Sequence, residues 1–209
     1  MNQIFKKQLL ILGLVIFFLP SFSRAQKVDS SWYQPRKLMG HKVPEISGTT
    51  IQSKKVDSVF LKNKVIVLAF GNLVNIGSLQ QIEWLNKIQE IFNDSSFSVL
   101  SIFPNAESDV KDFNSVTPNS TMGYQLRMTY NFPLMNYPVL ATCSNRNPDN
   151  SLRTACDSIV KDFLIAGYPV LILVDEKRIV RYVHVGMPPR ESQQEWYNVI
   201  DKQIRDLLK

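Results

Sequence analysis

The sequence is poor in the residues that hold metals or form reactive thiol pairs. It contains two cysteines and two histidines among 209 residues, and no Cys-x-x-Cys pair. His41 and His184 leave a metal pair open as an alternative, but a strand edge or the surface is the ordinary place for isolated histidines. We therefore expect no metal site and no cofactor.

A basic stretch with interleaved aromatic residues is also missing, which argues against nucleic acid as a partner. The formal net charge is +6. Three of the positive charges, Lys6, Lys7 and Arg24, lie in the N-terminal segment, which contains no acidic residue. Half of the net charge therefore belongs to that segment and not to the folded domain.

The only long apolar run is N-terminal and extends from Leu9 to Leu19. It is shorter than the roughly 20 residues that a membrane-spanning helix needs, so a transmembrane anchor is the weaker alternative. Ser23-Arg24-Ala25 then places small residues where a signal peptidase cuts. We predict a signal peptide over residues 1–25, no membrane anchor after cleavage, and export to the periplasm or the medium.

Export sets the expectation for the two cysteines, Cys143 and Cys156. In an oxidising compartment an even number of cysteines favours a structural disulfide. A bridge that closes so short a loop stabilises the fold by about 3 kcal/mol in the chain-entropy model. A free, reactive cysteine pair remains the alternative.

The hydrophobic pattern indicates an α/β fold with a central mixed β-sheet and helices on both faces. Residues 26–39 have no clear period and are expected to form a loose arm or one that orders on contact. Residues 40–209 form one domain. Its predicted strands are a short N-terminal pair around Ser47-Gly48, then 65–70, 97–103, 137–142, 170–174 and an edge strand at 179–185.

The predicted helices follow the apolar spacing between these strands. One begins near residue 78 and a short one covers 107–116, and a helix end is expected at 158–165. The last helix has an apolar face of Trp196, Ile200, Ile204 and Leu207. Residues 117–136 are predicted to be an irregular loop.

The junction between the first buried strand and its helix reads FGNLVNIGSLQQIEWLNKI over residues 70–88. Ser78 and Gln81 have the spacing of a capping box, so Ser78 is predicted to cap the helix. A catalytic role for Ser78 is less favoured, because no histidine is near in sequence. Asn75 is predicted to form a turn.

The order of these segments resembles the thioredoxin superfamily, in particular the exported redoxins of the TlpA-like branch. The segments that carry the resemblance are GHKVP at 40–44, LKNKVIVLAF at 61–70, FLIAGYP at 163–169 and VLILVD at 170–175. It implies a thioredoxin-like fold with an N-terminal β-hairpin extension and a cis peptide bond between Tyr168 and Pro169. It also places Asn75 and Ser78 where the family has its Cys-x-x-Cys pair.

Two functional hypotheses follow from the lost cysteines. In the first, the protein is a non-catalytic module that binds a protein or peptide partner in the cell envelope. The resemblance implies a binding groove formed by Val74, Asn75, Ser78, Tyr168 and Pro169. In the second, the protein is a thiol–disulfide oxidoreductase of cell redox homeostasis that uses Cys143 and Cys156. We favour the first, because neither cysteine aligns with the helix N-terminus that activates a thiolate in this family.

Overall fold

The computed structural model describes residues 30–143 and 158–209. The chain divides into two compact units, Met1–Ser30 and Ser31–Lys209, and the description below concerns the second. The predicted signal peptide and Cys156 lie outside the described residues. Within the described part of the chain, no helix combines the length and apolar character needed to cross a membrane.

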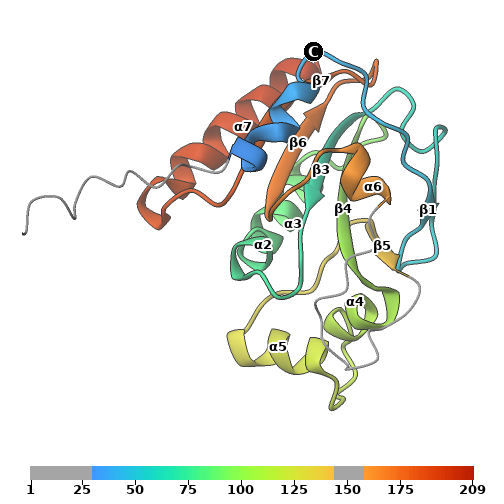
Figure 1. Cartoon of the computed structure of the whole chain (residues 1–209), viewed down its shortest axis with the longest axis vertical. Coiled ribbons are helices and arrows are strands. Elements are labelled where there is room, and N and C mark those ends of the chain that lie inside the picture. Colours follow the sequence, from blue (N-terminus) through green and yellow to red (C-terminus); the bar gives the residue numbers. More distant parts are fainter. Residues whose placement is uncertain (1–29, 144–157) are drawn as a thin grey trace, which may run out of the picture. The chain divides into compact units, whose positions relative to one another are not determined.

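A five-stranded mixed sheet in the order β5-β4-β3-β6-β7 forms the centre of the domain (Figure 1). β3 runs parallel to β4 and β4 parallel to β5, whereas β6 is antiparallel to both β3 and β7. The predicted mixed sheet is therefore confirmed. Its strands are β3 (Val65–Phe70), β4 (Phe97–Ala106), β5 (Val139–Cys143), β6 (Val170–Val174) and β7 (Val180–Val185).

The helices connect these strands or follow the last of them. β3 leads into α2 and α3, β4 into α4 and α5, β5 is followed by α6, and α7 ends the chain. The bounds are α2 (Ile76–Gln80), α3 (Ile82–Ile91), α4 (Glu107–Phe113), α5 (Met122–Tyr130), α6 (Ser158–Asp162) and α7 (Gln193–Leu207), with short 3-10 helices η2 (Ser30–Leu38) and η3 (Arg190–Ser192).

Two hydrophobic cores cover the two faces of the sheet, because alternate residues of a strand point to opposite faces. All six residues of β3 are buried. Val65, Val67 and Ala69 belong to the core that contains the apolar residues of α3 and α7. Ile66 and Phe70 belong to the core that contains residues of α6 and of the N-terminal segment. This two-sided burial explains the uninterrupted apolar run of the strand.

The predicted N-terminal hairpin is confirmed. β1 (Gly48–Thr49) and β2 (Lys55–Val56) pair in antiparallel register as a separate two-stranded sheet. The chain before this hairpin continues the main sheet, because Lys42 forms an antiparallel bridge with Ile179. The N-terminal extension therefore packs against the edge at β7, the strand that was predicted to be half exposed.

The prediction of an irregular loop over 117–136 is wrong, because α5 lies within it. Arg127 fixes this helix to α4 through tertiary contacts: its guanidinium donates to the Phe113 carbonyl and to the Ser115 carbonyl, each at 2.7 Å. Gly123 permits the close approach, since a Cβ atom there would lie 2.6 Å from the Asp109 carbonyl oxygen. α5 is stabilised by contacts with residues outside the helix. Its own apolar residues have too weak a helical periodicity to predict it from the sequence.

The arm predicted at 26–39 is ordered over its described part, where η2 forms a 3-10 helix. The residues directly after η2 attach this arm to the domain through backbone hydrogen bonds. The Gly40 N–H donates to the Val180 carbonyl at 2.8 Å, and the Val180 N–H donates to the His41 carbonyl at 2.9 Å. Backbone hydrogen bonds to β7 therefore hold the segment that joins η2 to the domain. Such bonds do not depend on a periodic pattern of apolar side chains, so the sequence contains no indication of this order.

Candidate functional site

Asn75 begins α2 and holds the junction between β3 and the helix. Its backbone is extended, and its side-chain Oδ1 accepts a hydrogen bond of 2.9 Å from the Ser78 backbone N–H. Asparagine is among the preferred N-cap residues because this bond satisfies one of the helix's unpaired N–H groups. Asn75 is therefore the N-cap of α2, in addition to forming the turn expected of it.

The predicted capping box at Ser78 and Gln81 is wrong. Ser78 lies inside the first turn of α2 and is buried, and its hydroxyl donates a 3.3 Å hydrogen bond to Asn75 Oδ1. Gln81 stands at the break between α2 and α3 and makes no side-chain cap. The local pattern fitted two possible helix starts, and the helix begins at the earlier one because Asn75 also has a partner across the fold.

That partner is the loop before β6. The Asn75 side-chain N–H donates to the Tyr168 carbonyl at 3.1 Å. The Tyr168–Pro169 peptide bond is cis, as predicted. A Cβ atom on Gly77 would lie 3.3 Å from Met187 Cβ and 3.4 Å from Pro169 Cδ, so the first turn of α2 packs directly against both residues. The structure thus brings the predicted site residues together.

The residues of this junction differ in exposure. Val74 and Ile76 are 49% and 41% exposed, whereas Ser78 is only 4% exposed. Asn75, Tyr168 and Met187 are half-buried, and Pro169 is buried. We call the accessible part, Val74, Asn75, Ile76, Tyr168 and Met187, the helix-entry surface. Ser78, which was placed in the predicted groove, lies beneath it.

Two further asparagines support the loop that leads to α2. Asn105 Oδ1, fully buried at the end of β4, accepts from the Leu73 N–H at 3.1 Å. Asn72 Oδ1 accepts from the Val74 N–H at 3.0 Å. Neither was predicted from the sequence. A polar residue at the end of an otherwise apolar strand was the available signal for Asn105, because buried polar groups are almost always hydrogen-bonded.

The arrangement around Asn75 has little capacity for covalent chemistry. A thiolate at a helix N-terminus is stabilised by unpaired N–H groups, but here the Asn75 amide already takes the Ser78 N–H. The Ser78 hydroxyl is hydrogen-bonded to the same amide and not to a base. An unactivated hydroxyl is a weak nucleophile. Over the described residues, no group of three or more His, Cys, Asp or Glu side chains could hold a metal ion.

The two histidines lie near opposite ends of β7. The His184 ring packs against that of Trp196 in a tilted arrangement, with 4.7 Å between ring centroids, and burial, with a smaller effect of Arg36, lowers the pKa of His184. His41 lies in the segment that pairs with Val180. Both histidines thus lie at the strand edge, one of the two places expected of them, whereas the packing of His184 against Trp196 was not predicted.

Cys143 lies on a different strand of the sheet from the one that leads to the helix-entry surface. It ends β5, which is separated from β3 by β4, and is 1% exposed. Its sulfur is bonded in a disulfide. The predicted partner, Cys156, lies outside the described residues, so the pairing and its structural role remain predictions.

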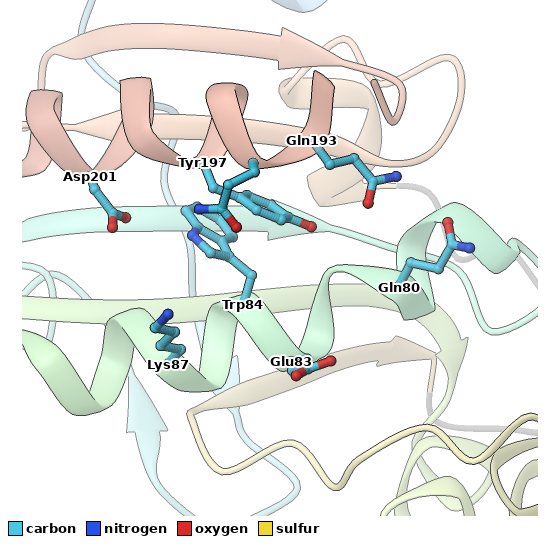
Figure 2. Close-up of a pocket in the computed structure, with 8 residues that line it drawn as sticks. Gln80, Glu83, Trp84, Lys87, Gln193, Tyr197 and Asp201 are labelled. Carbon is cyan, nitrogen blue, oxygen red and sulfur yellow. The ribbon is translucent and has the colours of Figure 1, made fainter. Parts of the chain in front are cut away.

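A second candidate site lies between α3 and α7 (Figure 2). It is a cavity of about 280 Å³, lined by Gln80, Glu83, Trp84, Lys87, Gln193, Gln194, Tyr197 and Asp201. Trp84 forms part of its wall and stacks on Tyr197 with ring centroids 4.8 Å apart. Burial, together with the charge of Glu83, raises the pKa of Tyr197 to about 12. The sequence gives no sign of this cavity, because its residues come from helices about a hundred positions apart.

Burial also raises the pKa of Asp201 above its usual value, although Arg205, Trp84 and Lys87 oppose the shift. The unfolded chain therefore loses this proton at lower pH than the folded protein does, and folding stability falls as the pH rises through that interval. We expect Asp201→Asn to raise the free energy of unfolding at neutral pH and to change it little at about pH 3. Urea unfolding at both pH values measures this.

The matched control is Asp206→Asn on the same helix. The pKa of Asp206 is lowered, chiefly by its hydrogen bond to Lys209, so its substitution should not stabilise the protein. A stabilisation of equal size by both substitutions would mean that general charge reduction, and not burial of Asp201, is responsible.

Comparison with known proteins gave structural matches only. No family model matches the sequence. No curated protein matches it either. Among solved structures, a protein assigned as the thiol:disulfide interchange protein DsbE of Chlorobium tepidum superposes with a TM-score of 0.57 at 18% identity, over 82% of this chain and 98% of that one.

Two further structures show the same similarity. A thioredoxin-family thiol:disulfide interchange protein from Chlorobium tepidum TLS has a TM-score of 0.53 at 18% identity, over 80% of this chain and 96% of its own. The thioredoxin domain of a thiol-disulfide oxidoreductase from Bacteroides vulgatus has a TM-score of 0.50 at 15% identity, over 79% and 97%. At such identities the similarity concerns the fold.

Proposed function

We propose that this protein, which has a thioredoxin-like fold, is an exported module that binds a polypeptide partner in the cell envelope and carries out no thiol–disulfide chemistry at its helix N-terminus. The observation that carries the proposal is the double hydrogen bond of Asn75. Its amide accepts from the Ser78 N–H and donates to the Tyr168 carbonyl. The position that a reactive thiolate needs is thus filled by a neutral side chain with no redox couple.

The helix-entry surface supports the binding part of the proposal. Val74 and Ile76 are exposed aliphatic residues on either side of the cap, and they stand on a backbone fixed by Asn72 and Asn105. Exposed apolar side chains on a rigid frame are suited to bind the apolar side chains of a partner, because little conformational entropy is lost. An extended polypeptide already exposes apolar side chains, so no folded domain of the partner would have to open before binding.

The export part of the proposal rests on the sequence. The segment at 1–25 has the charged start, the apolar run and the small residues of a signal peptide. An even cysteine count and the disulfide-bonded Cys143 agree with an oxidising compartment.

The binding proposal is tested with a peptide selected from a random displayed library against residues 26–209. We expect Ile76→Asp to weaken binding of this peptide by about tenfold or more, because a charge would replace an apolar contact. Val116→Asp is the matched control, since Val116 is also exposed, at 76%, but is not part of the helix-entry surface. Isothermal titration calorimetry gives both affinities.

Two results would contradict the proposal. One is a selected peptide whose affinity is unchanged by Ile76→Asp. The other is an equal loss caused by Val116→Asp, which would indicate a nonspecific effect of added negative charge.

A further inference from the structure

Basic side chains are concentrated along the edge of the sheet at β7. Lys42 forms an antiparallel bridge with Ile179, which places residues 36–42 beside residues 175–181, the turn between β6 and β7 and the start of β7. Backbone hydrogen bonds to Val180 continue this pairing. We call the surface formed by these two segments the basic edge.

The basic edge accounts for the net positive charge of the chain after residue 25. That part of the chain has a net charge of +3, since Lys6, Lys7 and Arg24 account for three of the six net positive charges. The two segments of the basic edge contain six Lys or Arg residues and two carboxylates, Asp175 and Glu176, and so have a net charge of +4. The rest of the chain after residue 25 therefore sums to −1.

Four cations of the basic edge form no ion pair within the described part of the chain, namely Lys37, Lys42, Lys177 and Arg178. The three lysines are exposed. Arg178 is half-buried, and its Nε–H has no hydrogen-bond acceptor among the described residues. Guanidinium groups bind phosphate and carboxylate oxygens strongly. An anionic partner from outside the chain would neutralise these side chains.

The turn that carries Lys177 and Arg178 has a fixed backbone. The buried Asp175 carboxylate accepts hydrogen bonds from the backbone N–H groups of Lys177, at 2.9 Å, and Ile179, at 2.8 Å. Its second oxygen is paired with the Arg181 guanidinium at 2.7 Å. The turn is therefore ordered before any partner binds, which lowers the entropic cost of binding.

We propose that the basic edge binds to an anionic membrane surface, where lipid phosphate groups pair with its lysine and arginine side chains. Met39 favours a membrane over an acidic polypeptide. It lies within the basic segment 36–42 and is 44% exposed. Positive charge combined with an exposed apolar side chain is typical of proteins that bind at the interface of a bilayer, and such binding needs no spanning helix.

The position of the basic edge in the fold supports this assignment. β6 begins at Val170, next to the helix-entry surface, and ends at Val174, next to the turn of the basic edge. At roughly 3.3 Å per residue, the two surfaces are about 15 Å apart along the strand. A protein bound to a membrane through the basic edge keeps the helix-entry surface free for a partner. The two surfaces share no residue, so this proposal and the proposed function can fail separately.

The test measures how much of the untagged chain of residues 26–209 sediments with lipid vesicles. Residues 1–25 are omitted because their apolar run would itself insert into lipid, and residues 31–209 form a compact unit without them. We expect an affinity at least about tenfold higher for phosphatidylcholine vesicles with about 30% phosphatidylglycerol than for pure phosphatidylcholine vesicles. The affinity should fall steeply between about 50 and about 300 mM NaCl, because salt screens exposed charges.

Two double variants with the same change in net charge locate the binding surface. Lys42→Glu/Lys177→Glu reverses two charges of the basic edge and should lower the affinity by about tenfold or more, since each basic side chain near an anionic surface contributes about fivefold. Lys54→Glu/Lys202→Glu is the matched control, because both lysines are exposed but lie outside the basic edge. It should lower the affinity by less than about threefold, the effect of net charge alone.

The proposal is overturned if phosphatidylglycerol does not increase binding to the vesicles, or if the two double variants lose affinity equally. Polyglutamate provides the comparison with an acidic polypeptide. If polyglutamate binds and the vesicles do not, the partner of the basic edge is an acidic polypeptide and the membrane proposal is wrong. Circular dichroism shows whether each variant folds, and the lipid and salt dependence of the wild type tests the proposal without any variant.

Discussion

The Asn75→Cys/Ser78→Cys double variant is expected to reduce insulin disulfides in the presence of dithiothreitol, whereas the wild type is expected to show no activity above the dithiothreitol background. The two positions lie at the N-cap and within the first turn of α2, next to the cis-Pro169 loop. A sulfur at position 75 would take over the hydrogen bond from the residue 78 N–H, which stabilises the thiolate and lowers the pKa of the thiol.

In the reaction, the thiolate at position 75 attacks one insulin sulfur and displaces the other as a thiol. The sulfur at position 78 then attacks the mixed disulfide, releases the second insulin thiol and leaves an intramolecular disulfide. Dithiothreitol reduces that bond and completes the cycle. Turbidity from precipitating insulin B chains measures the rate.

The single variant Asn75→Cys is the matched control, because it has the attacking sulfur but no resolving sulfur and should not cycle efficiently. The wild type tests the alternative hypothesis. If it reduces insulin, and the activity disappears in Cys143→Ser, then Cys143 and Cys156 carry the chemistry and the non-catalytic proposal is wrong. An inactive double variant that folds would show that the helix N-terminus does not activate a thiolate here.

The second large effect concerns stability. Asn75→Ala is expected to lower the free energy of unfolding by about 2 kcal/mol, of which about 1 kcal/mol is the lost N-cap and about 1 kcal/mol is the lost hydrogen bond to the Tyr168 carbonyl. The measurement is urea unfolding at neutral pH, followed by tryptophan fluorescence and circular dichroism.

Two variants separate the contributions. Ser78→Ala removes only a 3.3 Å hydrogen bond and should cost about 0.5 kcal/mol. Asn75→Asp keeps an acceptor for the Ser78 N–H but cannot donate to the Tyr168 carbonyl when ionised, so its cost should fall between the other two. If Ser78→Ala costs more than Asn75→Ala, the assignment of the cap to Asn75 is wrong.

The layered architecture could be predicted from the order of apolar segments in the sequence. β3 and β6 are uninterrupted apolar runs because both faces of the sheet are covered, and such runs are recognisable without a structure. The apolar spacing of α7 and the half-exposed pattern of β7 were equally clear. The cis bond before Pro169 was predicted only through the family resemblance, since no local property of the Tyr-Pro pair requires it.

Features that depend on partners distant in sequence could not be predicted in this way, because they form only when the chain is folded. α5 was missed because its stability comes from Arg127 bonding to carbonyls near the end of α4. The cavity between α3 and α7 was missed because neither helix alone carries a recognisable motif, and it exists only where the two pack together.

The N-cap of α2 also shows which features the local sequence specifies and which depend on the rest of the fold. Both Asn75 and Ser78 are good N-cap residues, so the local sequence fitted a helix start at either one. The choice was made by a carbonyl group 93 positions away, because only the earlier start places the Asn75 side chain within reach of Tyr168. A local pattern specifies which residues are able to cap a helix, but the hydrogen bond formed across the fold supplies the additional free energy that selects one of them.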